Sequence, residues 1–272
     1  MKIYVHIGAE KTGSTSIQSF LKKNRESLQK NRVCFPQSTG DLNHVKLVAH
    51  CEDDSFNKRV YQLIGISNKE QKDAWSVDML EEFRQEVASV AEQTDKLVIS
   101  SELFQTYFTK ETELIELKRI LHQFSQDIEI VVYIRRQVDA AISLFSTQLR
   151  SGGTNAIPLS ESMKKARRYD YKVLLDLWKT VFGKEKVSPR IYDKTSLIGQ
   201  DIVTDFCSVI GIEPDRNVYQ IPDPQNTSLS VVGQYLLLEL NQMMPFDAKA
   251  RHKRVRIISC LLYTSPSPRD RG

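Results

Sequence analysis

A short segment near the amino terminus combines glycines, a lysine and hydroxyl side chains in a pattern suited to binding an anion. The segment reads Gly8-Ala9-Glu10-Lys11-Thr12-Gly13-Ser14-Thr15-Ser16. Two glycines permit a tight backbone turn, so that successive N–H groups can converge on an oxyanion, and a helix that begins near Ser16 adds partial positive charge. We therefore expect Lys11 and residues 12–16 to bind phosphate. The alternative is a turn rich in glycine and serine that binds nothing.

The position of the lysine separates this segment from the P-loop of nucleotide triphosphatases. In that motif a lysine follows the second glycine. Here Lys11 precedes Gly13, and Gly13 is followed directly by Ser14 and Thr15. The loop is therefore predicted to bind phosphate without being a standard triphosphatase loop.

A second group of polar residues follows the apolar run Ile128 to Ile134. Arg135, Asp139 and Ser143 are spaced four residues apart, so all three are expected on one side of a helix or of its entry. A guanidinium and a hydroxyl group so placed can bind another phosphate. Alternatively, Arg135 pairs with Asp139 on the surface and Ser143 faces the sheet.

A carboxylate and two histidines are the candidates for acid–base chemistry. Glu102 follows the predicted strand Lys96 to Ser100, where a carboxylate near a cationic loop can act as a general base. It could instead cap the next turn or pair with Lys11. His44 and His50 could be a base or contact a substrate, or they could be capping or solvated side chains. No second ligand cluster accompanies them, so no metal site is predicted.

The elements that would position these residues alternate between strand and helix. Apolar runs predict strands over 2–7, 96–100, 128–134 and 187–192, and helical periodicity covers 16–28, 79–90, 114–124, 139–145, 173–181, 200–210 and 229–243. The stretch 33–76 has no regular pattern. This alternation predicts an α/β fold, a central parallel β-sheet flanked by helices on both faces, with ligand sites at the carboxyl ends of its strands.

Composition narrows the class of protein. The chain has 272 residues, 40% hydrophobic and 26% charged, and a net charge of +4 that is too small to imply nucleic-acid binding by itself. No apolar run approaches the roughly 20 residues needed to span a membrane. Ile3 is already the first apolar residue of the predicted strand over 2–7, which leaves no room for a secretory leader, so we expect a cytoplasmic protein. The four cysteines lie far apart and are expected to be reduced thiols.

We expect a single domain over 1–258. The last residues, 259–272, lose all periodicity, and we expect a non-native or disordered tail there. The sequence gives no indication of an oligomeric state.

Lys11-Thr12-Gly13-Ser14-Thr15 after a first strand, together with Arg135 and a serine eight residues later, resembles the family of soluble, bacterial-type sulfotransferases that use 3′-phosphoadenosine 5′-phosphosulfate (PAPS). The resemblance covers roughly residues 3–150 and Tyr192. It implies a P-loop nucleotide-hydrolase-like fold, PAPS as sulfuryl donor, adenosine 3′,5′-bisphosphate as product, and no requirement for a metal.

The resemblance also implies roles for individual residues. Residues 11–16 would hold the 5′-phosphosulfate, Arg135 and Ser143 the 3′-phosphate, and Tyr192 the adenine, although Tyr192 could also be an ordinary strand residue. Lys11 would stabilise the departing phosphate oxygen, and Glu102 would take the acceptor's proton. The acceptor would be a hydroxyl group on a carbohydrate or other small molecule. Alternatives are a small-molecule kinase that uses ATP and Mg²⁺, and a nucleotide-binding module without catalysis.

Overall fold

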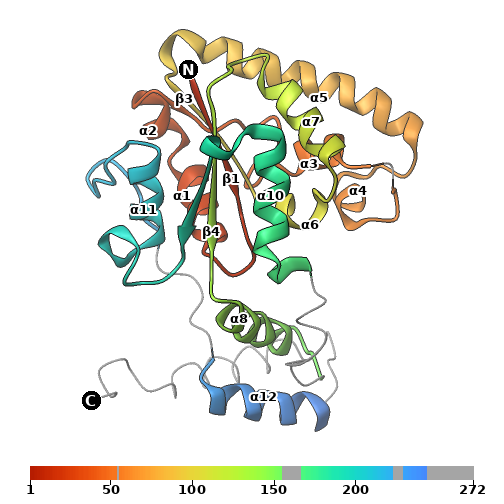
Figure 1. Cartoon of the computed structure of the whole chain (residues 1–272), viewed down its shortest axis with the longest axis vertical. Helices are drawn as coiled ribbons and strands as arrows, with labels where there is room; N and C mark the ends of the chain where they lie inside the picture. Colours follow the sequence, from red (N-terminus) through yellow and green to blue (C-terminus); the bar gives the residue numbers. More distant parts are fainter. Residues whose placement is uncertain (54, 155–166, 223–228, 244–272) are drawn as a thin grey trace. The chain divides into compact units, whose positions relative to one another are not determined.

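Five parallel strands form the central sheet of the protein (Figure 1). The strands are β1 (Lys2–Ile7), β2 (Val33–Cys34), β3 (Lys96–Ser101), β4 (Ile128–Ile134) and β5 (Val187–Ile191), in the order β2-β3-β1-β4-β5. Ile3 of β1 is in register with Leu97 of β3 and Ile128 of β4, so β1 lies between these two strands. The predicted α/β fold is confirmed. The strands β1 and β4 have the predicted bounds because both are rich in apolar residues that are buried in the sheet.

The computed structural model describes residues 1–53, 55–154, 167–222 and 229–243. The chain divides into two compact units, one of Met1–Arg135 with Asp170–Asp223 and one of Arg136–Tyr169 with Pro224–Gly272. The expectation of one domain over 1–258 stays a prediction. The segment 259–272, expected to be a non-native or disordered tail, lies outside the described residues.

In the first unit, alternate side chains of the central strands enter two separate hydrophobic cores. On β4, Ile130 and Val132 belong to one core, and Val131 and Tyr133 to the other. The first core is completed by α3 (Val45–Cys51), α4 (Arg59–Ile64), α5 (Lys69–Val90), α6 (Leu103–Tyr107), α7 (Glu111–Leu121) and α10 (Tyr171–Phe182). The second is completed by α1 (Ser14–Lys23), α2 (Arg25–Lys30) and α11 (Ile202–Val209). Helices therefore cover both faces of the sheet, as predicted.

Three short 3₁₀ helices complete the regular structure of this unit: η1 (Ala91–Gln93), η3 (Lys184–Lys186) and η4 (Ile198–Gln200). Asn68 caps α5 by accepting a hydrogen bond from the Gln71 amide, so this helix begins ten residues before the predicted start at Met79. The polar first turns of α5 carry no apolar periodicity that could have marked this start.

The prediction of a single helix over 16–28 was wrong, because the structure has two helices that are separated at Asn24. The side chain of Asn24 is buried and donates to the carbonyls of Phe20 (2.8 Å) and Gln220 (2.9 Å). Its oxygen accepts a hydrogen bond from the Gln220 amide at 2.7 Å. These bonds compete with the helical hydrogen-bond pattern, and α1 therefore ends at Lys23.

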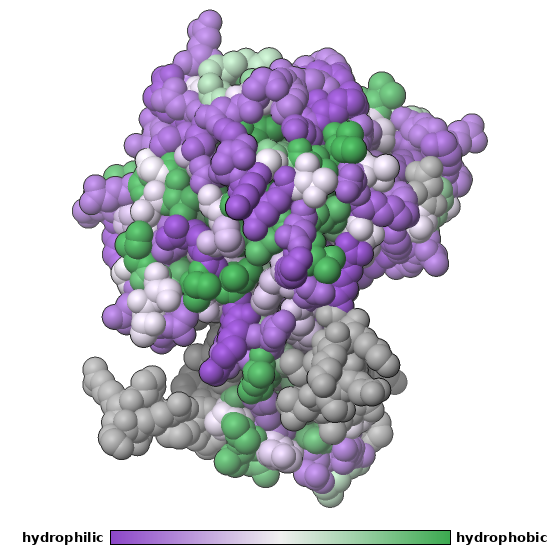
Figure 2. All heavy atoms as spheres, viewed as in Figure 1, coloured by the Kyte–Doolittle hydropathy of each residue, from purple (hydrophilic) through white to green (hydrophobic). Residues whose placement is uncertain are grey.

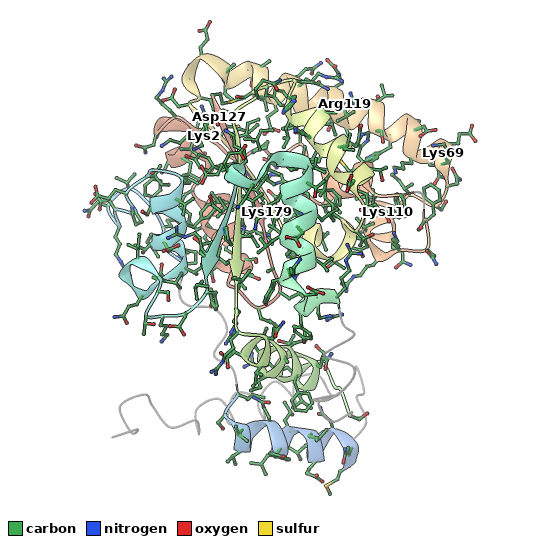
Figure 3. All side chains as sticks on the ribbon, viewed as in Figure 1. Lys2, Lys69, Lys110, Arg119, Asp127 and Lys179 are labelled. Atoms are coloured by element: carbon green, nitrogen blue, oxygen red, sulfur yellow. The ribbon has the colours of Figure 1, made fainter. Side chains whose placement is uncertain are left out.

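Charged residues at the amino ends of the strands pair with one another. Lys2 contacts Glu129 at 2.6 Å, and Lys186 contacts Asp127 at 3.0 Å; Lys2 and Asp127 are labelled in Figure 3. Each pair is partly exposed and contributes at most about 1 kcal/mol. On the face seen in Figure 2, hydrophilic side chains cover much of the described part of the chain, with smaller hydrophobic groups between them.

The second unit is built around α8 (Gln137–Arg150) and α12 (Val231–Met243), with the 3₁₀ helix η2 (Arg167–Tyr169). The two longer helices pack through Phe145, Leu149, Leu229, Leu237 and Leu238. Asn241 donates to the carbonyls of Leu149 (2.9 Å) and Gly153 (2.8 Å). Across the described part of the chain, none of the helices combines the length and the apolar character needed to cross a membrane.

Candidate functional site

The predicted site residues of the first unit follow the carboxyl ends of four strands. The loop after β1 begins at Gly8, Glu102 follows β3, Arg135 follows β4 and Tyr192 follows β5. Since the strands are parallel, these four ends lie at one edge of the sheet. In the strand order, β3 and β2 lie on one side of β1, and β4 and β5 lie on the other. Such a reversal of strand order is where open α/β sheets bind ligands.

Gly8 allows the loop to lie against the backbone at Glu102. A Cβ atom added to Gly8 would lie 2.8 Å from the Cα atom of Glu102 and 2.8 Å from Oγ of Ser14. The Gly8 amide also donates to the carbonyl of Ser101 at 3.0 Å. Only glycine permits this approach, and it fixes the distance between the loop and the carboxylate-bearing turn.

The loop turns through two left-handed residues. Lys11 has φ 64° and Gly13 has φ 79°, and a non-glycine residue in this region is strained by roughly 1 to 3 kcal/mol. The hydroxyl of Thr12 donates to the carbonyl of Ala9 at 2.6 Å, and that of Ser14 donates to the same carbonyl at 3.3 Å. Thr12 is fully buried. Its side chain therefore stabilises the turn.

Four consecutive backbone amides of the loop are suited to binding an anion. Within the described residues, no acceptor is bonded to the N–H groups of Thr12, Gly13, Ser14 or Thr15. Gly13 precedes α1, and no side chain caps this helix. Amides at a helix start combine hydrogen-bond donors with the positive end of the helix dipole. The amide of Ser16, by contrast, donates to the Gly13 carbonyl at 2.9 Å.

Arg135 lies beside the loop. Its Nη1 donates to the carbonyl of Lys11 at 2.9 Å, and its guanidinium lies 5.5 Å from the ring centre of Tyr192. Arg136, and not Arg135, pairs with Asp139, through two hydrogen bonds of 2.9 and 2.8 Å. In the structure, the predicted alternative of an ion pair between Arg135 and Asp139 is therefore replaced by the pair between Arg136 and Asp139.

Tyr192 contacts the turn from the other direction. A Cβ atom added to Gly13 would lie 3.1 Å from Cε2 of Tyr192. Burial raises the pKa of Tyr192, so its hydroxyl stays protonated near neutral pH. Ser143 lies on α8 in the second unit, where its carbonyl accepts a hydrogen bond from Thr147 at 3.1 Å. Its predicted role at a phosphate stays a prediction.

Both oxygens of the Glu102 carboxylate accept hydrogen bonds from neutral amides. Oε2 accepts from Nε2 of Gln18 at 2.7 Å, and Oε1 accepts from Nδ2 of Asn43 at 2.9 Å. Glu102 precedes α6, but its side chain does not cap that helix. The carboxylate is thus half-buried and held in one orientation by two amides.

Gln18 and Asn43 were not among the residues predicted for the site. Gln18 lies one helical turn after Ser14, and this spacing is the only local signal that it faces the sheet edge. Asn43 lies in the irregular stretch after β2, 59 residues from Glu102 along the chain. No local sequence pattern reports a contact across that separation.

The two histidines considered as bases make internal contacts. His44 is fully buried; its Nδ1 accepts from the Ser100 amide at 2.7 Å, and its Nε2 lies 3.1 Å from the carbonyl of Pro36. Burial lowers the pKa of His44 to about 4. His50 lies 2.9 Å from Oγ of Ser76 and 2.9 Å from Oε1 of Glu116. We therefore do not include either histidine in the site that we propose.

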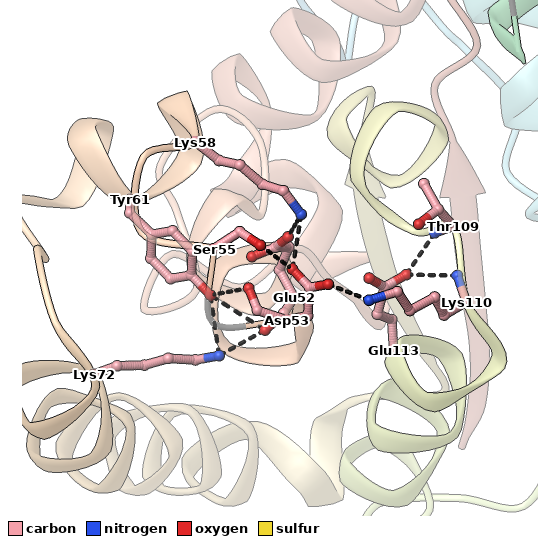
Figure 4. Close-up of polar contacts among 9 residues, drawn as sticks. All are labelled: Glu52, Asp53, Ser55, Lys58, Tyr61, Lys72, Thr109, Lys110 and Glu113. Atoms are coloured by element: carbon pink, nitrogen blue, oxygen red, sulfur yellow. Dashed lines mark hydrogen bonds and ion pairs between the residues drawn. The ribbon is translucent and has the colours of Figure 1, made fainter.

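A separate cluster of carboxylates lies near the start of α7 (Figure 4). Oxygen atoms of Glu52, Asp53 and Glu113 lie within 4.8 Å of one another. The ammonium groups of Lys58 and Lys110 contact this cluster, Lys58 at 2.8 Å from Asp53 and Lys110 through the other oxygen of Asp53. Because lysines already supply positive charge here, we assign the cluster to an ion-pair network.

Comparisons with known proteins find distant similarities. No protein-family model matches the sequence. An uncharacterized protein of Archaeoglobus fulgidus is 26% identical over 167 residues, which cover 60% of this chain and 43% of the relative. The matched part therefore spans less than half of that relative's length. A crystal structure of a sulfotransferase from Alicyclobacillus acidocaldarius aligns over 97% of this chain and 96% of its own, with a TM-score of 0.47 and 16% identity. We base the functional proposal on this chain's residues.

Proposed function

We propose that this protein is a sulfotransferase that moves a sulfuryl group from PAPS to an acceptor hydroxyl. The observation that carries the proposal is the arrangement at the sheet edge. A loop with four amides that can bind an anion lies between a carboxylate, Glu102, and an arginine, Arg135. This set supplies an anion site, a proton acceptor and a second phosphate ligand.

In this proposal the loop binds the 5′-phosphosulfate end of the donor. The amides of residues 12–15 donate hydrogen bonds to its oxygens, and the hydroxyl of the exposed Thr15 can add another. Lys11, directly before Thr12, supplies positive charge where the phosphate oxygen departs. The Arg135–Lys11 hydrogen bond supports the turn that places Lys11 there.

The transfer itself is an in-line displacement at sulfur. The acceptor oxygen forms a bond to sulfur while the bond from sulfur to the phosphate oxygen breaks, and the acceptor's proton passes to Glu102. The electron pair of the broken bond stays on the phosphate, where Lys11 and the loop amides stabilise it. The residues of this chain therefore account for each charge and proton of the reaction.

The remaining donors of Arg135 support recognition of a 3′-phosphate. One of its five N–H groups bonds to Lys11, and a guanidinium can bind phosphate through two others. We place the adenine near Tyr192 only by the family resemblance. The acceptor class, a carbohydrate or another small molecule with a hydroxyl group, likewise rests on that resemblance.

The proposal is tested by measuring transfer of labelled sulfate from PAPS to a panel of glycans, phenols and lipids. Lys11→Ala and Glu102→Gln are each expected to lower kcat by about 10²-fold or more, because each removes a group that acts in the transition state. The exposed Lys30→Ala and Glu92→Gln serve as matched controls with unchanged rates. Phosphoryl transfer from ATP in place of sulfuryl transfer would refute the proposal, and an unchanged rate in Glu102→Gln would remove Glu102 from the mechanism.

A further inference from the structure

Two amide side chains from distant parts of the sequence hold the carboxylate of Glu102. We infer that Gln18 and Asn43 are positioning residues, which orient this carboxylate so that it can accept the acceptor's proton. The inference rests on the proposed function. It adds two residues that touch the base and not the reacting atoms.

Gln18 is fixed by its surroundings in α1. Its side chain is buried, and besides the 2.7 Å bond to Glu102, its Nε2 lies 3.5 Å from Oγ of Ser100. That hydroxyl lies 2.8 Å from Nδ1 of His6, which is itself fully buried. Burial lowers the pKa of His6 to about 3, so it is neutral at the pH at which the protein would work. Glu102 is therefore connected to the core by a chain of neutral groups.

Asn43 is fixed on both sides along the backbone. Before it, Asp41 contacts Lys22 of α1 and accepts from Nη1 of Arg25 at 2.8 Å. After it, the His44 amide donates to the Ser100 carbonyl at 3.1 Å. The loop after β2 is thus attached to the helices on one side of Asn43 and to β3 on the other. Asn43 can therefore act as a rigid donor to Glu102.

The chemistry of the two donors suits a general base. An amide donates a hydrogen bond without placing a positive charge beside the carboxylate. Each oxygen of the Glu102 carboxylate accepts one hydrogen bond from an amide and can accept a second hydrogen bond. Gln18 also lies on α1, the helix that begins at the anion-binding amides. One helix therefore positions both the donor's phosphate and the base.

The inference is tested with Gln18→Met and Asn43→Ala, each alone and combined with Glu102→Gln. Gln85→Met is the matched control, because the exposed Gln85 also donates to a carboxylate, that of Glu81, at 2.9 Å. We expect each single change to lower kcat about tenfold, with KM for the donor unchanged, since a hydrogen bond to a charged group is lost. In the Glu102→Gln background the same changes should have less than about a twofold effect. Independent, multiplying effects would overturn the inference.

A second measurement does not depend on activity. The side-chain amide proton resonances of Gln18 and Asn43 should both move in Glu102→Ala, while that of Gln85 should not. If the wild-type protein transfers no sulfuryl group, the proposed function fails, and these resonances still test the contacts. Resonances that do not respond to Glu102→Ala would overturn the positioning role even in an active enzyme.

Discussion

At the scale of single residues, the geometry of the site depends on the absence of a side chain at Gly8. A methyl group there would meet the Cα atom of Glu102 at 2.8 Å, and backbone cannot move aside as cheaply as the end of a side chain. We expect Gly8→Ala to lower the free energy of unfolding by about 1 to 3 kcal/mol and to weaken nucleotide binding. Urea unfolding and calorimetric titration measure the two effects.

Gly65→Ala is the control for this change. Gly65 has φ 74°, and a Cβ atom there meets nothing within 4 Å. Gly65→Ala should lower the free energy of unfolding by about 1 to 2 kcal/mol through left-handed backbone strain alone, and it should leave nucleotide binding unchanged. Equal nucleotide affinities in Gly8→Ala and the wild type would contradict the close packing of the loop on Glu102.

The buried histidines make stability depend on pH. Burial lowers the pKa of His44 to about 4, whereas its ordinary value is 6.5. Between these values the unfolded chain binds a proton that the folded protein does not, so stability is full above about pH 6.5 and falls as the pH decreases toward 4. His6, with a pKa of about 3, acts in the same direction.

We therefore expect His44→Gln to reduce the pH dependence of unfolding. From pH 6.5 to pH 5, protonation of this one histidine in the unfolded chain accounts for about 1.5 kcal/mol. Urea unfolding of wild type and variant at both values measures the difference in slope. An identical loss of stability in the two proteins would show that His44 is not buried in its neutral form.

Some residues of the candidate site could be predicted from the sequence and others could not, for a physical reason. Lys11, Glu102 and Arg135 follow parallel strands, and the ends of parallel strands meet, so order along the chain was enough to bring them together. Gln18 and Asn43 join the site through single side-chain contacts between separate segments. The place of His44 in the sequence did not indicate that this residue is buried, because the stretch around it has no clear hydrophobic period.

At the scale of elements, Asp205 attaches α11 to the sheet. It is fully buried and accepts hydrogen bonds from Tyr133 of β4 at 2.7 Å, from Arg190 of β5 at 2.7 and 2.8 Å, and from the Ile198 amide at 3.0 Å. Asp205→Ala leaves a tyrosine and an arginine without their acceptor. We expect a loss of about 3 to 5 kcal/mol in urea unfolding.

The exposed Asp176 provides the comparison. It contacts Lys172 one turn away on α10, and Asp176→Ala should cost no more than about 0.5 kcal/mol. A loss below 1 kcal/mol in Asp205→Ala would mean that this buried network does not stabilise the attachment of α11.

Elements were predicted best where burial is continuous. The strands β1 and β4 bury apolar side chains on both faces of the sheet. The helices α3 and α4 could not be predicted within 33–76, because they have only seven and six residues, too few for a helical period to emerge. The break at Asn24 depends on a contact with Gln220, 196 residues away.

At the scale of the whole molecule, the amino ends and the carboxyl ends of the strands carry different kinds of charged and polar groups. The amino ends of the strands carry ion pairs that neutralise one another, such as Lys2 with Glu129. The carboxyl ends carry backbone amides, Arg135 and a carboxylate held by neutral groups. The net charge of +4 therefore says little about the ligand, and the local arrangement at the carboxyl edge says more.

The most direct test of this account is calorimetric titration with adenosine 3′,5′-bisphosphate, with adenosine 5′-monophosphate and with ATP and Mg²⁺. We predict that the bisphosphate binds in the presence of EDTA, at least about tenfold more tightly than the monophosphate, because Arg135 adds charge-assisted hydrogen bonds to the 3′-phosphate. Arg135→Ala should remove that difference. Binding of ATP only, and only with Mg²⁺, would contradict the central claim.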